Sequence, residues 1–311
     1  MGVDYAQNMD IPHFGEEQPA DIYYFSPLTV NVFGCTDLTK KPTIMKAYGY
    51  TEAEGNKGSN NVASLIIKVL EDFGWLIQGQ TGKQLSIIMD NCGGQNKNNN
   101  VLRLALYLVE LQYFEVVQFV FYVRGHTKND CDRLFNQLKL RWHKKNTYTM
   151  NQLVECLNLQ PNVEFVEVTS DSFKDYGTIL DKFYKPFQPG TIQQHHVFVV
   201  ESTNPTLMKM KTSRDDDETY SYQFHNNKHI PLNNRFSALQ RFNIQVLPRP
   251  GIKPIKQVEL YKKWRPFIPV QYRDEICPRP SDEVIASVKS ERNKKARDRM
   301  AKKKRGGREA S

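Results

Sequence analysis

The feature that most constrains the fold of this chain is a short apolar run that ends in an aspartate. Leu85–Met89 is too short for a helix and predicts a buried strand, which Asp90 closes. The pair Gly93–Gly94 predicts the turn that follows, and the apolar-periodic segment Val101–Leu111 predicts a helix. Open α/β sheets carry their sites at the carboxyl ends of central strands, beside such a turn and helix. We therefore expect the functional site at Asp90.

The neighbouring patterns predict an α/β fold. A one-sided apolar face over Val62–Phe73 indicates a helix, and Gly74 suits its left-handed C-terminal cap. Val116–Val123 is nearly continuously apolar, as in a strand buried on both faces, and it should lie beside Leu85–Met89. This order predicts a mixed sheet flanked by helices. Further strands are expected at Val3–Gln7, Ile22–Phe25, Leu28–Phe33, Ile44–Tyr50 and Glu164–Thr169, and further helices at Asp130–Lys144 and Met150–Leu159.

The sequence changes character after residue 185. Lys185–Gly190 contains two prolines and a glycine and predicts a linker. Three strand-like segments follow, at His196–Glu201, Leu207–Thr212 and Thr219–Phe224. We expect a sheet domain over residues 1–185, a small, β-rich C-terminal α+β region over 186–275, and a charged, mostly disordered basic tail over 276–311. From Ser281 onward, this tail is expected to begin as a helix that frays.

The basicity of the chain is concentrated in that tail. Lys289–Arg308 holds eleven Lys and Arg residues and two acidic residues, so it carries the whole net charge of +9. The folded body is neutral, which weakens any argument for nucleic-acid binding from global charge. Within the tail two clusters predict a bipartite nuclear-import signal: Lys294, Lys295, Lys302, Lys303, Lys304 and Arg305. A solvated tail with weak, salt-sensitive nucleic-acid affinity is a compatible reading.

Cysteine usage and hydropathy favour an intracellular protein. The five cysteines are odd in number, scattered and without a CxxC pair, which is typical of a reducing compartment. No apolar run approaches the ~20 residues that span a bilayer, so no membrane partner is expected. Together with the basic tail, this predicts a nuclear location.

Three aspartates can converge at one edge of the predicted sheet. Asp4 lies on the first expected strand, Asp90 ends the central one, and Asp132 opens a helix. Carboxylate oxygens suit Mg²⁺, which proteins usually hold with one or two carboxylates. Two such ions ~3.5–4 Å apart can drive phosphoryl transfer. Alone, Asp4 is better explained as an acid near a frayed terminus. Asp90 could also be a turn former, but the block around it favours a functional role.

Four blocks resemble a known family: Asp4–Asn8, Gly58–Ser64, Asp90–Asn98 and Gly125–Asp132. They are similar to an uncharacterised eukaryotic family of transposase-like domains with the RNase H-like fold of DDE/DDD transposases. The resemblance covers residues 4–144 and, more loosely, Ile255–Tyr272. It implies a nuclease or strand-transferase that acts on DNA phosphodiesters with Mg²⁺ or Mn²⁺ in a two-metal site. It also implies a homodimer, because transposition usually needs more than one catalytic domain.

The resemblance assigns roles to residues of this chain. Asp4, Asp90 and Asp132 become the metal ligands, with His126 as a further catalytic group. Asp130 competes with Asp132, since both lie in the first turn of a helix, where acids are favoured anyway. The amides of Asn91, Gln95 and Asn96 are expected to orient Asp90 or contact phosphate. Contacts to nucleic acid are expected from Arg141, Trp142, Lys144 and Lys145, although Trp142 also fits a buried position.

One departure from the family pattern bears on activity. Such proteins usually carry a long N-terminal region before the first aspartate, whereas three residues precede Asp4 here. This departure is typical of a fragment, a truncated gene copy or a domesticated remnant, and it bears on activity more than on fold. The alternative to an active enzyme is a catalytically inactive module that binds nucleic acid or protein, and a nuclease that acts on RNA is a weaker third reading.

Overall fold

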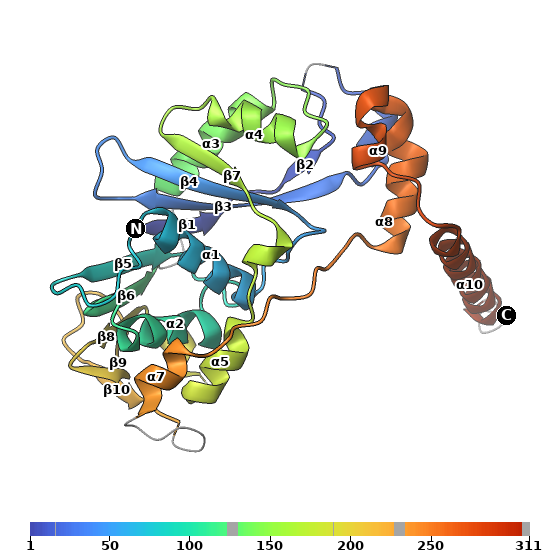
Figure 1. Cartoon of the computed structure of the whole chain (residues 1–311). Helices are drawn as coiled ribbons and strands as arrows, with labels where there is room; N and C mark the ends of the chain where they lie inside the picture. Colours follow the sequence, from blue (N-terminus) through green and yellow to red (C-terminus); the bar gives the residue numbers. More distant parts are fainter. Residues whose placement is uncertain (16, 123–129, 189, 227–233, 307–311) are drawn as a thin grey trace.

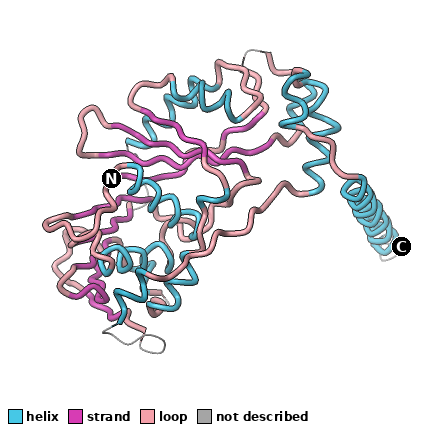
Figure 2. The backbone as a smooth tube through the Cα atoms, viewed as in Figure 1, coloured by secondary structure: helices cyan, strands magenta, loops and turns pink. Residues whose placement is uncertain are grey.

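The computed structural model contains one large mixed sheet with helices on both faces (Figures 1 and 2). It describes residues 1–15, 17–122, 130–188, 190–226 and 234–306. The strands are β1 (Gly2–Tyr5), β2 (Met9–Ile11), β3 (Leu28–Asp37), β4 (Ile44–Thr51), β5 (Gln84–Met89), β6 (Val116–Phe121), β7 (Val163–Glu167), β8 (Val197–Glu201), β9 (Asn204–Lys211) and β10 (Tyr220–Gln223). The predicted α/β class, a mixed sheet flanked by helices, is confirmed.

Helices fill the connections between these strands. The α-helices are α1 (Ser59–Asp72), α2 (Asn99–Glu110), α3 (Asp130–Trp142), α4 (Met150–Asn158), α5 (Tyr176–Phe183), α6 (Thr191–Gln194), α7 (Arg235–Gln240), α8 (Pro254–Glu259), α9 (Arg273–Ile276) and α10 (Asp282–Gly306). Shorter turns are η1 (Ala20–Tyr24), η2 (Ser170–Ser172), η4 (Leu260–Trp264), η5 (Arg265–Phe267) and η6 (Val270–Tyr272). None of the helices in the described ranges has the length and apolar character needed to cross a membrane.

The strand β1 lies in the middle of the sheet. The order is β10-β9-β8-β6-β5-β1-β3-β4-β7, and β2 pairs with β3. β1 is antiparallel to β3 and parallel to β5, and β5 and β6 pair in parallel over their whole lengths. The predicted adjacency of the Asp90 strand and the Val116 strand is thereby confirmed. Because β5 and β6 run in the same direction, the loops after them open at the same edge of the sheet.

Two hydrophobic cores cover the two faces of the sheet. One packs α1, α2 and α5 against β5, β6 and β8, as in the lower half of Figure 1. The other packs α3 and α4, together with Leu260, Trp264 and Ile276 of the C-terminal segment, against β2, β3 and β4. The predicted helix cap is also present, since Gly74 has a φ of +68° after α1.

The structure differs from the sequence-based expectations in three places: the strands after residue 185, the C-terminal tail, and residues 22–25. β8, β9 and β10 extend the main sheet through antiparallel pairing of β6 with β8, so they are not a separate small region. The tail, expected to be mostly disordered, is the 25-residue helix α10, which projects from the body (Figure 1). The helix expected from Ser281 onward is therefore present and longer than expected, because its Lys, Arg, Glu and Ala residues have high helix propensity. Ile22–Phe25, expected as a strand, is mostly the 3-10 turn η1, with Tyr23 and Tyr24 exposed.

Candidate carboxylate site at the edge of the sheet

Asp4 and Asp90 lie at the same level of two neighbouring strands. Gly2 of β1 pairs in parallel with Ile88 of β5, and each aspartate is two residues further along its own chain. Val3 and Met89 belong to the core on the α1–α2 face. Because side chains alternate along a strand, the two aspartates face the opposite side of the sheet, where α3 lies.

Cys131 fixes the start of α3 over β1 and β3. Its buried Sγ lies 3.5 Å from the carbonyl oxygen of Gly2 and 3.4 Å from Oγ1 of Thr36. Gly34 allows this close approach, since a Cβ there would lie 2.4 Å from the ring of Phe135 on α3. The first turn of α3, with Asp132, is therefore held next to β1.

The electrostatics around Tyr122 show which charges gather at this edge. Burial raises the pKa of the Tyr122 phenol, and the charges of Cys131, Asp130, Asp132 and Asp4 raise it further. Burial likewise raises the pKa of the Cys131 thiol to about 12, with Asp4 and Asp132 adding to the effect. Carboxylates from β1 and from α3 thus act on the same small region.

Asp90 is held by its own loop. Nδ2 of Asn96 donates a hydrogen bond to Oδ1 of Asp90, and the Cys92 amide lies 3.4 Å from the same oxygen. Asn96 is 1% exposed, and its Oδ1 has no hydrogen-bond partner among the described residues. Since a buried acceptor without a partner is unfavourable, this oxygen suits a donor or a hard cation.

The predicted three-carboxylate metal centre is only partly assembled. Within the described ranges, no three His, Cys, Asp or Glu side chains lie close enough together to hold a metal ion. Asp4, Asp90 and Asp132 therefore share a region and not a complete ligand shell. The oxygens of Asp90 and Asn96 still fit Mg²⁺, which usually keeps several waters and uses one or two carboxylates.

The other predicted site residues have different surroundings. Asp130 accepts hydrogen bonds from Oγ1 of Thr43 at 3.3 Å and from Arg133 at 3.4 Å, so its carboxylate is engaged at the start of α3. The carbonyl of Gln95 accepts from the side chain of Asn98, which also caps α2. Asn91 lies half-buried in the same loop. His126 lies outside the described residues.

The predicted nucleic-acid contact by Trp142 is wrong. The indole is 5% exposed, stacks on His13 with ring centres 3.9 Å apart, and donates to Oγ1 of Thr147. It is a core residue that closes the end of α3 and leaves no ring face for a base. Arg141 contacts Gln160, whereas Lys144 and Lys145 are exposed.

Lys57 is a neighbour of the site that sequence reasoning missed. Its Nζ donates to Oδ1 of Asn8 at 2.6 Å and lies 4.7 Å from the centre of the Tyr5 ring. Burial lowers its pKa, and the carboxylate of Asp4 opposes that shift. The only sequence signal was its position in the polar loop before α1. It supplies a positive charge beside the predicted first ligand.

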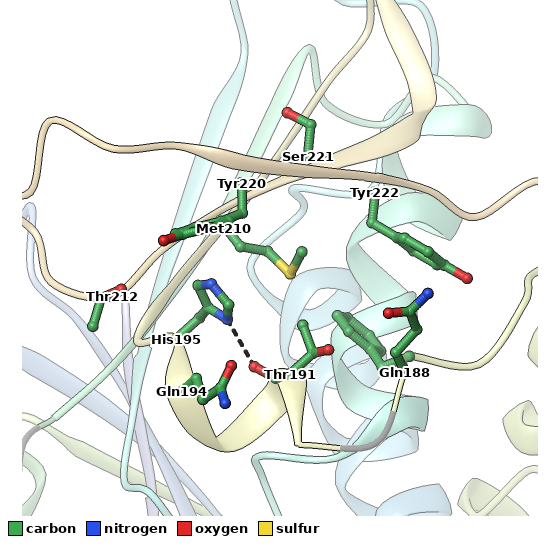
Figure 3. Close-up of a pocket in the computed structure, with 10 residues that line it drawn as sticks. Gln188, Thr191, Gln194, His195, Met210, Thr212, Tyr220, Ser221 and Tyr222 are labelled. Atoms are coloured by element: carbon green, nitrogen blue, oxygen red, sulfur yellow. Dashed lines mark hydrogen bonds between the residues drawn. The ribbon is translucent and has the colours of Figure 1, made fainter.

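A concave surface lies far along the sheet from these carboxylates. Figure 3 shows this pocket of about 530 Å³, which lies over β9 and β10 and is lined by Phe187, Met210 and Tyr220 among others. His195 also lines it, with Nδ1 2.7 Å from the carbonyl oxygen of Thr191. β8, β6 and β5 separate its strands from β1. The pocket is therefore distinct from the carboxylate site.

Fold and site together define an α/β protein with carboxylates gathered at the edge of a mixed sheet. The chain belongs to the family described as "Domain of unknown function (DUF7869)", whose model matches residues 23–216. The matched segment includes Asp90, Asn96 and Asp132 and begins after β1. Neither a curated protein nor a solved structure matches the chain.

Proposed function

We propose that this chain is a transposase-derived, divalent-metal-dependent nuclease or strand-transfer domain that acts on DNA phosphodiesters. The shared level of Asp4 and Asp90 in neighbouring parallel strands, with Asp132 held over β1, carries the proposal. The sheet adds support, because β1 lies between the antiparallel strands β3 and β4 and the parallel strands β5 and β6. That arrangement is compatible with the RNase H-like fold implied by the sequence resemblance.

The chemistry would be divided between a metal and the residues of the loop. When bound, Mg²⁺ or Mn²⁺ would activate the attacking oxygen and stabilise the leaving oxygen. Asp90 would supply the principal carboxylate, and Asn96 fixes the position of its Oδ1. Asp132 and Asp4 would add negative charge that draws the cation to this edge, and Lys57 would limit the repulsion at Asp4.

A catalytically inactive binding module is the second candidate function. It is favoured by the absence, among the described residues, of three metal-ligating side chains within reach of one ion. A domain of this kind would keep the sheet and the loops and would bind nucleic acid or protein without cleavage.

We further propose that the chain binds DNA, forms a homodimer and is located in the nucleus. Lys294 and Lys295 are exposed on α10, and Nζ of Lys295 lies 2.7 Å from Glu291. A helix with positive charge at many positions suits both an import receptor and a nucleic-acid backbone.

Cleavage of labelled duplex DNA by the full chain with Mn²⁺ or Mg²⁺ tests the enzyme. We expect cleavage that is lost in Asp90→Asn and Asp132→Asn and retained in Asp217→Asn, which changes an exposed loop carboxylate. Equal cleavage by all four proteins would contradict the assigned site. Absence of cleavage together with DNA binding that is unchanged in Asp90→Asn would instead support the binding module.

A further inference from the structure

Lys97 is a buried lysine that directly follows Asn96 in the Asp90 loop. It is 4% exposed, and its Nζ has no hydrogen-bond partner among the described residues. The ammonium group lies 5.5 Å from the centre of the Phe121 ring, at the end of β6. A lysine is rarely buried unless it is paired, so this position suits an anion that the described residues do not supply.

Lys83, at the other end of β5, has the hydrogen-bond partner that Lys97 lacks among the described residues. Its Nζ lies 5.2 Å from the centre of the Phe114 ring, in the same relationship to an aromatic ring. Unlike Lys97, it also donates a hydrogen bond to the carbonyl oxygen of Trp75. Burial lowers the pKa of both lysines, and that of Lys97 falls to about 8.

Within the described ranges, no carboxylate forms an ion pair with Lys97. Burial alone accounts for the lowered pKa of Lys97. Burial also lowers the pKa of the nearby His196, and the charge of Lys97 lowers it further. Residues 123–129, which follow β6 in the sequence, include no Asp or Glu. The attraction of the Phe121 ring is modest beside the cost of removing an ammonium group from water.

We propose that Lys97 binds a phosphate group of a nucleic-acid backbone, beside the carboxylate of Asp90. The proposal rests on the proposed function in taking DNA as the ligand. Asn96 links the two positions, since it bonds to Asp90 and precedes Lys97. The helix α2 begins two residues later, and its N-terminal dipole also favours an anion here. The loop would thus hold a metal-binding oxygen and a phosphate-binding cation side by side.

Thermal unfolding of the full chain in inorganic phosphate, against sodium chloride of equal ionic strength, tests the phosphate site. Lys97→Met should raise the melting temperature without phosphate, because it removes a buried unpaired charge and keeps the length of the side chain. Phosphate should stabilise the wild type and Lys83→Met and leave Lys97→Met unchanged. Equal stabilisation of all three proteins, or of none, would overturn the site.

Binding of duplex DNA at several salt concentrations tests the source of the phosphate. Lys97→Met should weaken binding at low salt and reduce the slope of log K against log salt by about 1, whereas Lys83→Met should change neither. DNA binding that is the same in wild type and Lys97→Met would overturn nucleic acid as the ligand. These binding results do not depend on catalysis. If Lys97→Met loses phosphate and DNA binding, the phosphate site is supported even where the wild type cleaves no DNA. If Lys97→Met keeps both cleavage and full DNA binding, the role of Lys97 is rejected, while the proposed function is not.

Discussion

Arg235 and Glu110 form a buried bidentate ion pair. Nε of Arg235 lies 2.6 Å from Oε1 of Glu110, and its second terminal nitrogen lies 2.9 Å from Oε2. The hydroxyl of Tyr184 donates to the same carboxylate at 2.8 Å. Because Glu110 ends α2 and Arg235 begins α7, this pair ties the segment after the sheet to the main body.

Removing one partner of that pair should be costly. Arg235→Met would leave the Glu110 carboxylate buried without its cation, and we expect a loss of about 3–5 kcal/mol in the free energy of unfolding, measured by urea denaturation. Arg279→Met breaks an exposed pair with Asp282 and should cost less than about 1 kcal/mol. Similar losses in the two variants would show that the buried pair adds no special stability.

Local patterns were sufficient for most of the sheet and its helices. The apolar periodicity before Gly74 and the continuous run after Val116 each reflect burial that a short window of sequence records. The attachment of β8 to β6 could not be predicted in the same way, because it joins residues about 80 positions apart, as in the pairing of Val117 with Val200. Local propensity carries no information on such a pairing.

The residues of the candidate site could be proposed from the sequence, whereas the contacts among them could be predicted only in part. The sequence block around Asp90 predicted a loop whose amides orient the Asp90 carboxylate. The hydrogen bond that Asn96 donates to Asp90 agrees with this prediction. The unpaired Nζ of Lys97 could not be predicted, because burial of a loop lysine depends on the strand beneath it. For Trp142, the sequence left a buried and an exposed position open, and stacking on His13 decides between them.

Acid should destabilise the protein through His13. Burial lowers the pKa of His13 to about 4, with the charge of His143 as a second cause, and its Nε2 is buried without a hydrogen-bond partner in the described ranges. The unfolded chain binds a proton near pH 6.5 and the folded chain only near pH 4, so stability falls as the pH drops between these values.

His13→Phe is the matched variant for this effect. It keeps a ring stacked on Trp142 and removes the proton-binding nitrogen. In urea denaturation at pH 7, 5.5 and 4, the variant should lose less stability than the wild type as the pH falls. Parallel pH profiles for the two proteins would rule out His13 as the source.

The basic helix should direct the protein to the nucleus. Deletion of residues 290–311 from a fluorescent fusion should abolish nuclear accumulation, because it removes ten of the eleven basic residues that carry the net charge of the chain. Glutamine at the exposed Lys40 and Lys41 changes charge elsewhere and should leave localisation unchanged. Nuclear accumulation that survives the deletion would exclude α10 as the import signal.

The carboxylate site should respond to metal even in the absence of substrate. An ion that binds only the folded state stabilises it by mass action, by about 2.7 kcal/mol at a concentration 100-fold above its dissociation constant. Mn²⁺ should therefore raise the melting temperature of the wild type. Asp90→Asn should lose most of that shift, since it removes the charge that attracts the ion while keeping an oxygen for Asn96. It should also be slightly more stable than the wild type without metal, because one of several like charges at the edge of the sheet is gone.

The exposed Asp217→Asn should behave as the wild type in both conditions. A wild type that does not respond to Mn²⁺, or an Asp90→Asn that responds in full, would reject the metal site and leave the binding module as the function of this fold.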